Sequence, residues 1–384
     1  MENRCLWKPG RRSAPLGLGC IVAVALAGCG AGKTNAQQAT AVQVASCVKA
    51  ANSLLRQYTA PLRFILPGPS FNMAANKGKT VWDISPNISN QIQSGVAQGV
   101  QAAGAAAGLT VHVWDGNNSV PTEEQGVSEA VAQHASGIIL QSVEASLISG
   151  PLAAATAAHI PVVQWDDNDP GTPLDGVSAR VTSNFFRDGE AMGAYVLVHS
   201  NCNADALVLY PSAFPNNVDI WHGFAGEVGK YCKSCDVIAV AINPATAATV
   251  VGPEVQTYIR QNPKLKWVVP TYDDLASTVV VPAIQAMGSA GASVHVVSHD
   301  GNTANLALIR SKTVQVADIA FPPSQYQGWV MIDQIGRLMA GVAPGSDLVP
   351  TTLVDTSNIP SSNAALYRDF GNYQAAFKKL WKLG

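Results

Sequence analysis

Residues 80–115, TVWDISPNISNQIQSGVAQGVQAAGAAAGLTVHVWD, contain one complete unit of the fold. The runs "TVWDIS" and "LTVHVWD" are short, apolar and rich in β-branched and aromatic residues, which favours strands. Between them, "NQIQSGVAQGVQAAGAAAG" places apolar residues at helical spacing. Two strands joined through a helix pair in parallel by a right-handed crossover. This stretch therefore predicts a βαβ unit.

The same alternation extends along most of the chain. The apolar runs "SGIILQS" and "IPVVQWD" follow further helical stretches, "DNDPGTPLDG" interrupts the pattern, and "SARVTSN" restarts it. After the interruption, we expect helices at 185–199, 216–231, 249–262, 274–289 and 325–340. The strand runs are nearly continuous in apolar residues, as in parallel sheets that helices cover on both faces. The sequence therefore predicts an α/β protein with two doubly wound parallel-sheet lobes.

Composition excludes several classes of function. The chain has 384 residues, enough for two domains, and a formal charge of −2, which provides no basic field for nucleic acid. It contains no Gly-x-Ser-x-Gly elbow and no HExxH pair, and its seven histidines are scattered. We therefore expect no enzyme activity, no cofactor, no metal site and no nucleic-acid partner.

The N-terminus supports export. Basic residues lie within the first twelve positions, and an apolar stretch of 16 residues follows, shorter than the ~20 needed for a membrane span. In "LAGCGAGKT" (26–34), the tail is like a phosphate-binding loop, but that motif requires glycine where Ala27 stands. The head resembles a bacterial lipobox. We expect a signal peptide at 1–28, a lipidated Cys29 and a lipid-anchored spacer and extended lead-in at 29–79; an uncleaved single-span anchor is the alternative.

Four cysteines remain after the predicted leader and Cys29: Cys47, Cys202, Cys232 and Cys235. An even number outside a reducing cytosol favours disulfides. The "CKSC" segment could be a redox pair, but no thioredoxin-like arrangement surrounds it, and a structural disulfide is the preferred interpretation. The pairing stays open, with Cys202, Cys232 and Cys235 favoured as partners of one another over any pair that includes Cys47.

The order of several segments resembles that of type I periplasmic (solute-) binding proteins, in particular the ribose-binding-like sugar branch. The resemblance covers about residues 80–345. Its segments include "AVAQHASGIIL", "AAHIPVVQWDD", "TSNFFRDGEAMGAYV", "VVSHDGNTANLALIRSKTVQVADIA" and "QGWVMIDQIGRLMAG". It implies an N-terminal lobe of 80–183 plus 321–345, a C-terminal lobe of 184–320, three crossovers with a cleft between the lobes, and a C-terminal crossover and tail helix at 346–384.

The resemblance also implies a function. Proteins of this family hold a solute as two lobes close and deliver it to the permease subunits of an ABC importer. We therefore expect a monomeric lipoprotein on the outer face of the cell membrane that binds a sugar or polyol. The alternative is a receptor for a cationic or aromatic molecule that serves a sensor or signalling system.

Candidate ligand-binding residues follow the carboxyl ends of parallel strands, where ligands of open α/β sheets bind. In the resemblance, Asn90, Asp166 and Ser183 match polar sugar contacts, whereas Asp167 replaces a frequent arginine. The full set is Asn90, Gln93, Trp165, Asp166, Asp167, Ser183, Trp221, Tyr272, His299 and Asp300.

Each candidate also has a structural explanation. The aspartates after Trp165 could form a solvated turn, and Asp300 could cap the next helix. Trp165 and Trp221 could be core residues, and His299 could satisfy a local hydrogen bond.

The charge of these positions predicts the class of solute. Asp and Asn oxygens accept hydrogen bonds from neighbouring hydroxyls, whereas a carboxylate or phosphate solute would require an arginine fork. The arginines common in the family are missing here, and only Arg180 and Arg187 lie near the first crossover. We therefore expect a neutral polyhydroxylated or a cationic solute, and not an anion.

Overall fold

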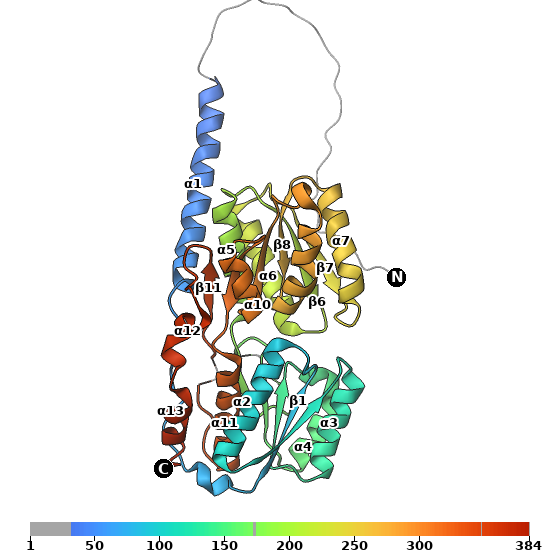
Figure 1. The fold of residues 1–384 in the computed structure, drawn as a ribbon, viewed down its shortest axis with the longest axis vertical. Helices are drawn as coiled ribbons and strands as arrows, with labels where there is room; N and C mark the ends of the chain where they lie inside the picture. Colours follow the sequence, from blue (N-terminus) through green and yellow to red (C-terminus); the bar gives the residue numbers. More distant parts are fainter. Residues whose placement is uncertain (1–31, 172–173, 347, 384) are drawn as a thin grey trace, which may run out of the picture.

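The computed structural model describes residues 32–171, 174–346 and 348–383, which form two α/β lobes (Figure 1). The predicted signal peptide and the predicted lipid site at Cys29 lie outside these residues. Within the described part of the chain, no helix combines the length and apolar character that a membrane crossing requires.

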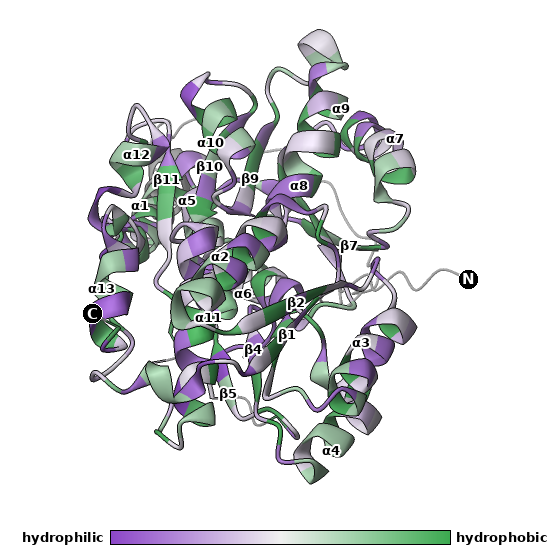
Figure 2. Cartoon of the chain, turned by 60° about the horizontal axis from the view of Figure 1, so that its bottom comes forward, coloured by the Kyte–Doolittle hydropathy of each residue, from purple (hydrophilic) through white to green (hydrophobic). Residues whose placement is uncertain are grey.

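The first lobe contains a parallel five-stranded sheet in the order β2-β1-β3-β4-β5. Its strands are β1 (Thr80–Ser85), β2 (Thr110–Asp115), β3 (Gly137–Gln141), β4 (Val162–Trp165) and β5 (Ala179–Val181). Its helices are α2 (Gln91–Ala107), α3 (Val120–Ala132), α4 (Ser149–Ala157) and α11 (Ser324–Met339). Figure 2 shows both hydrophilic and hydrophobic residues along α3, as expected for a helix that covers a sheet with one face.

Small residues allow α2 and α11 to pack closely. A Cβ atom at Gly99 of α2 would collide with the carbonyl group of Gln325, and one at Gly328 of α11 would collide with the backbone of α2. The glycine- and alanine-rich sequence of α2 therefore sets the distance between these two helices.

The second lobe has a six-stranded sheet in the order β11-β10-β9-β8-β6-β7. Its strands are β6 (Asp205–Pro211), β7 (Val237–Ile242), β8 (Leu265–Pro270), β9 (His295–Asp300), β10 (Gln315–Ala320) and β11 (Thr352–Asp355). Its main helices are α5 (Phe185–His199), α6 (Pro215–Tyr231), α7 (Ala247–Gln261) and α10 (Thr303–Arg310). The helix expected at 274–289 is divided into α8 (Asp273–Leu275), a π-helical segment (Ala276–Val280) and α9 (Val281–Gln285).

The C-terminal tail is more than a crossover and a helix. It contributes β11, which pairs antiparallel with β10 at the edge of the second sheet. It then returns to the first lobe through α12 (Asn363–Leu366) and ends with α13 (Tyr373–Leu380), which packs on α11. The indole rings of Trp329 and Trp381 stack there with their centroids 5.2 Å apart.

The segment predicted as a spacer contains a long helix, α1 (Gly32–Tyr58), which packs against α5 of the second lobe (Figure 1). Cys47, Ala51 and Leu55 are buried, because a spacing of four residues places them on one face of the helix. Beyond α1 the chain runs to the first lobe, where the Phe71 amide donates to the Leu380 carbonyl group. The lead-in therefore belongs to the folded body.

The structure contains two disulfides, Cys47–Cys202 and Cys232–Cys235. The predicted Cys232–Cys235 pair is present, but the preference for joining Cys202 to one of those residues was wrong. Cys202 follows α5, and α1 lies along that helix, so Cys47 and Cys202 face each other. Treating the residues before 80 as a spacer concealed this pairing.

Three crossovers join the lobes as predicted, at 182–184, 321–323 and 340–351. The lead-in at 59–72 and the tail at 356–372 add two further connections on the same side of the molecule (Figure 1).

Candidate ligand-binding cleft

A cavity of about 230 Å³ lies between the lobes, at the carboxyl ends of the parallel strands. The first lobe contributes polar residues, among them Asn90, Gln93, Ser142 and Asp166. The second lobe contributes apolar side chains, Phe214, Ile220, Leu275 and Val279, and polar ones, Asn216, Asn217, Thr271, Tyr272, Asp274, His299 and Asp300. The cavity therefore has both hydrogen-bonding groups and an apolar wall.

Asp166 follows β4 and has a left-handed backbone conformation with φ 56°. The residue is 7% exposed, and its carboxyl group makes no hydrogen bond to any described residue. Burial raises the pKa of Asp166 to about 8, and the negative charge of Asp300 adds to this effect. The Asp166 carbonyl oxygen accepts a hydrogen bond from Asn216 Nδ2 at 3.0 Å, which links the lobes.

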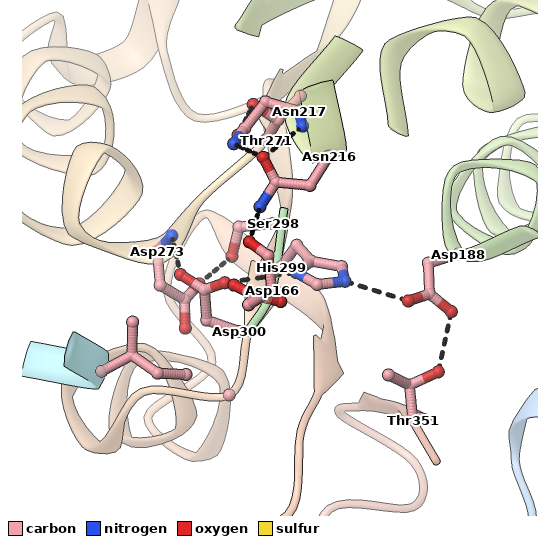
Figure 3. A network of polar contacts seen from close by, with 12 residues as sticks. Asp166, Asp188, Asn216, Asn217, Thr271, Asp273, Ser298, His299, Asp300 and Thr351 are labelled. Carbon is pink, nitrogen blue, oxygen red and sulfur yellow. Dashed lines mark hydrogen bonds and ion pairs between the residues drawn. The ribbon is translucent and has the colours of Figure 1, made fainter. Parts of the chain in front are cut away.

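His299 lies between two carboxylates (Figure 3). Its Nε2 is 3.1 Å from Asp188 Oδ2, and its Nδ1 is 3.2 Å from Asp300 Oδ1. Burial alone would lower the pKa of His299, but the hydrogen bonds to Asp188 and Asp300 outweigh it and raise this pKa to about 10. The imidazole is therefore positively charged at neutral pH. Thr351, on the third crossover, donates to Asp188 Oδ1 at 2.7 Å.

A second group of hydrogen bonds fixes the side chain of Asp300. Asp300 Oδ2 accepts from the Asp273 amide at 3.1 Å, and Asp273 accepts from the Ser298 hydroxyl and the Asn302 amide. Burial and the nearby Asp318 carboxylate raise the pKa of Asp273 well above its usual value. The carboxyl group of Asp300 is therefore fixed at the cavity wall.

Asp274 links the lobes at another part of the cavity wall. Its Oδ2 accepts from the Gln91 amide of the first lobe at 3.4 Å. Burial and Asp300 raise the pKa of Asp274 to about 6, so this carboxyl group is largely ionised at neutral pH.

The structure brings six of the ten predicted site residues to the cavity wall: Asn90, Gln93, Asp166, Tyr272, His299 and Asp300. Asn90 is also the N-cap of α2, since its Oδ1 accepts from the amides of Ile92 and Gln93. Asp300 does not cap the next helix, whose N-cap is Asn302.

The other four predicted residues lie outside the cavity wall. Trp165 is buried and donates its indole N–H to Gln327 Oε1 on α11 at 2.8 Å, because the strand directs it toward the helix layer. Trp221 lies on α6 and stacks on Tyr210. Trp165 therefore has the core role named as its alternative, whereas Trp221 is half-buried and packs against the core.

The two polar residues outside the wall have structural partners. Asp167 accepts hydrogen bonds from Gln164 and Asn168 at 2.9 and 2.8 Å. Ser183 donates to the Val349 carbonyl oxygen at 2.8 Å and so joins the first and third crossovers.

Sequence reasoning missed several wall residues. Ser142 and Thr271 directly follow β3 and β8, and the rule that found Asp166 and Asp300 applies to them too. Asn216 and Asn217 lie in the first turn of α6, and Thr271 donates to Asn217 Oδ1. The doubled asparagine at a helix start was the available signal for that pair.

Neither arginine near the first crossover reaches the cavity. Arg180 donates to the Asp169 carbonyl oxygen at 3.1 Å, and Arg187 pairs with Glu190 at 3.2 Å. Among the residues described, no lysine or arginine lines the cavity.

The sequence of residues 84–342 matches the family described as periplasmic binding protein domain. The chain belongs to this family. A search of the curated proteins found none that matches the sequence.

Solved structures of periplasmic binding proteins share the fold. A 5-methylthioribose transporter solute binding protein from Thermotoga lettingae superimposes with a TM-score of 0.70 at 15% identity, over 80% of this chain and 99% of that one. An ABC transporter solute binding protein from Agrobacterium vitis with bound allitol gives 0.67 at 16% identity, over 74% and 97%. A sugar ABC transporter protein from Yersinia enterocolitica gives 0.68 at 16%, over 83% and 99%. At these identities the likeness shows the two-lobed fold.

Proposed function

We propose that this protein is the exported solute-binding lipoprotein of an ABC importer and captures a small polyhydroxylated solute by closure of its lobes. One observation carries the proposal: the interlobe cavity is lined by carboxyl and amide groups and by no lysine or arginine of the described chain. The binding of allitol and of 5-methylthioribose by proteins of the same fold supports a sugar or polyol as the class of solute.

The composition of the wall suits such a solute. Carboxylate and amide oxygens accept hydrogen bonds from neighbouring hydroxyls, and Phe214, Ile220 and Leu275 provide an apolar surface for the C–H face of a sugar. An anion would bring further negative charge beside Asp166 and Asp300 without a guanidinium partner. An uncharged or cationic solute is therefore favoured over a carboxylate or phosphate.

The proposed setting is the outer face of the cell membrane, with lipid at Cys29 and permease subunits as partners of a monomer. The sensor alternative uses the same cleft, and the two differ in what binds the closed lobes. Co-purification of permease subunits supports transport, whereas co-purification of a histidine kinase supports signalling.

A thermal-shift screen of the purified protein tests the class of solute. The panel contains sugars, polyols, amines and carboxylates, and a solute at 100 times its dissociation constant adds about 2.7 kcal/mol to the stability. We expect shifts with hydroxyl-rich solutes, loss of the shift in Asp166→Ala, and an unchanged shift in the control Asp236→Ala, which alters an exposed residue outside the cavity wall. Shifts with carboxylates alone would contradict the proposal.

A further inference from the structure

Asp166 is a largely buried residue, and its carboxyl group has no hydrogen-bond partner among the described residues. It belongs to the cavity wall, and the residue has a left-handed backbone, a conformation that aspartate tolerates better than most residues. Figure 3 shows it beside the His299–Asp300 pair. A carboxyl group that lines a cavity and has no partner in the chain is free to accept hydrogen bonds from a bound molecule.

The charges around this carboxyl group do not balance. The single positive charge of His299 is shared between Asp188 and Asp300, which leaves that group with a net negative charge. Asp274 adds a further carboxylate to the wall, and no described lysine or arginine faces it. The net negative charge of the wall therefore favours a ligand that carries positive charge.

The acceptor atoms of the wall also indicate which chemical group of a ligand can bind to them. Gln93 Oε1 is a second buried acceptor in the cavity wall without a hydrogen-bond partner. A hydroxyl group brings one donor and no charge, whereas an ammonium group brings three donors and a positive charge. Within the described chain, no three or more His, Cys, Asp or Glu side chains are grouped to hold a metal ion. An organic ammonium group fits these atoms better than a metal ion does.

We propose that the solute is an aminated polyol or amino sugar whose ammonium group binds between the carboxyl groups of Asp166 and Asp300. This inference rests on the proposed function and narrows its class of solute. The hydroxyl groups of the solute then face the amide side chains of the wall, such as Asn216 and Asn217, and its carbon skeleton lies on the apolar side of the cavity.

Binding of an ammonium group requires Asp166 to be ionised. The charged groups that face it are Asp300 and His299 from β9, Asp188 from α5 and the adjacent Asp167. Since burial and Asp300 raise the pKa of Asp166 to about 8, the unliganded protein carries a proton there at pH 6. Affinity for an ammonium solute should therefore rise between pH 6 and pH 8, and binding should release a proton.

Isothermal titration of the whole protein with matched pairs tests the inference. The probes are 1-amino-1-deoxy-D-sorbitol against D-sorbitol, 1-amino-1-deoxy-D-galactitol against galactitol, and the 2-amino-2-deoxy sugars against the parent glucose, galactose and mannose. At pH 8 we expect the aminated member of at least one pair to bind about tenfold or more tightly than its parent. The Asp166→Asn variant should lose this preference, and Asp236→Asn should keep it.

The pH dependence of the wild-type protein provides a readout that does not depend on a folded variant. Affinity for the preferred aminated probe should fall about tenfold or more from pH 8 to pH 6. Equal or tighter binding of the parent sugars or polyols would overturn this inference and leave the proposed function intact. Failure of every pair to bind would overturn both, and saturable Ca²⁺ binding that depends on Asp166 would overturn the ammonium assignment.

Discussion

Asp166 combines two unfavourable features at a single residue: it is largely buried, and its carboxyl group has no hydrogen-bond partner among the described residues. Folding alone would not favour such a residue, because an uncharged side chain such as asparagine would be buried here at lower cost. Local violations of this kind are expected where a site is built for a ligand. A substitution at Asp166 should therefore weaken solute binding and at the same time increase the stability of the protein without solute.

Replacing Asp166 by asparagine should stabilise the protein in the absence of solute. The folded pKa of Asp166 is raised to about 8 from 3.8, so between these values only the folded state binds this proton, and its contribution to stability declines as pH rises. At pH 8, Asp166→Asn should increase the free energy of unfolding by about 1–3 kcal/mol, with a smaller difference at pH 5. Urea unfolding at both pH values measures this. A variant less stable than wild type at pH 8 would contradict the buried, unpartnered carboxyl group.

A substitution in the Asp188–His299–Asp300 group should destabilise the protein, although the pH dependence has the same direction as that of Asp166. Since the folded pKa of His299 is raised to about 10, its contribution is complete below the unfolded value near 6.5 and is lost as pH rises through 10. Asp188→Asn should lower the pKa of His299 and cost about 3–5 kcal/mol near neutral pH, because it breaks a buried pair. An NMR titration of the His299 ring follows the pKa. Titration of wild-type His299 near 6.5 would refute the charged assignment.

At the scale of elements, the sequence predicts those whose apolar pattern is long and regular. The expected helix 185–199 coincides with α5, and the expected 325–340 differs from α11 by one residue at each end. The helix expected at 274–289 is interrupted by a π-helical segment and ends earlier, a change in hydrogen bonding that apolar spacing does not reveal. β11 was missed because a four-residue edge strand carries too little pattern.

The long helix α1 shows a different limit. The stretch "SCVKAANSLLRQYT" around Cys47 has helical periodicity, but its partner α5 is more than a hundred residues away in sequence, and nothing local identifies it. The Cys47–Cys202 disulfide joins these two distant segments covalently.

Removing the Cys47–Cys202 disulfide should cost about 2–5 kcal/mol, because the bridge closes a loop with a sequence separation of 155. The Cys232–Cys235 bridge, with a separation of 3, should contribute less. Urea unfolding of the two double serine variants under oxidising conditions compares them. An equal or larger loss of unfolding free energy for the Cys232–Cys235 variant would contradict the role of the Cys47–Cys202 bridge in holding α1 against the second lobe.

At the scale of the whole molecule, two lobes and a cleft followed from the repeated βαβ pattern and from the family resemblance. The set of residues that line the cavity could not be predicted in full, because a position at the end of a strand does not determine whether the side chain faces the cavity. Trp165 and Ser183 satisfy the same positional rule as Asp166, yet Gln327 and Val349 bind them from other segments. Those partners come from the long-range packing of α11 and the third crossover.

Solute binding should draw the lobes together, since wall residues come from both lobes and the interlobe bonds of Asp166 and Asp274 are few. Small-angle X-ray scattering should show a smaller radius of gyration when the solute with the largest thermal shift is added. Asp166→Ala, under the same conditions, should show no change. An identical radius with and without saturating solute would argue against closure.

The most direct measurement is a crystal structure of the protein with the tightest-binding solute from the screen. We predict that the solute lies between the lobes with donors within hydrogen-bond distance of the carboxyl groups of Asp166 and Asp300. A solute bound elsewhere, or one held in the cleft through a lysine or arginine and without either aspartate, would contradict the account.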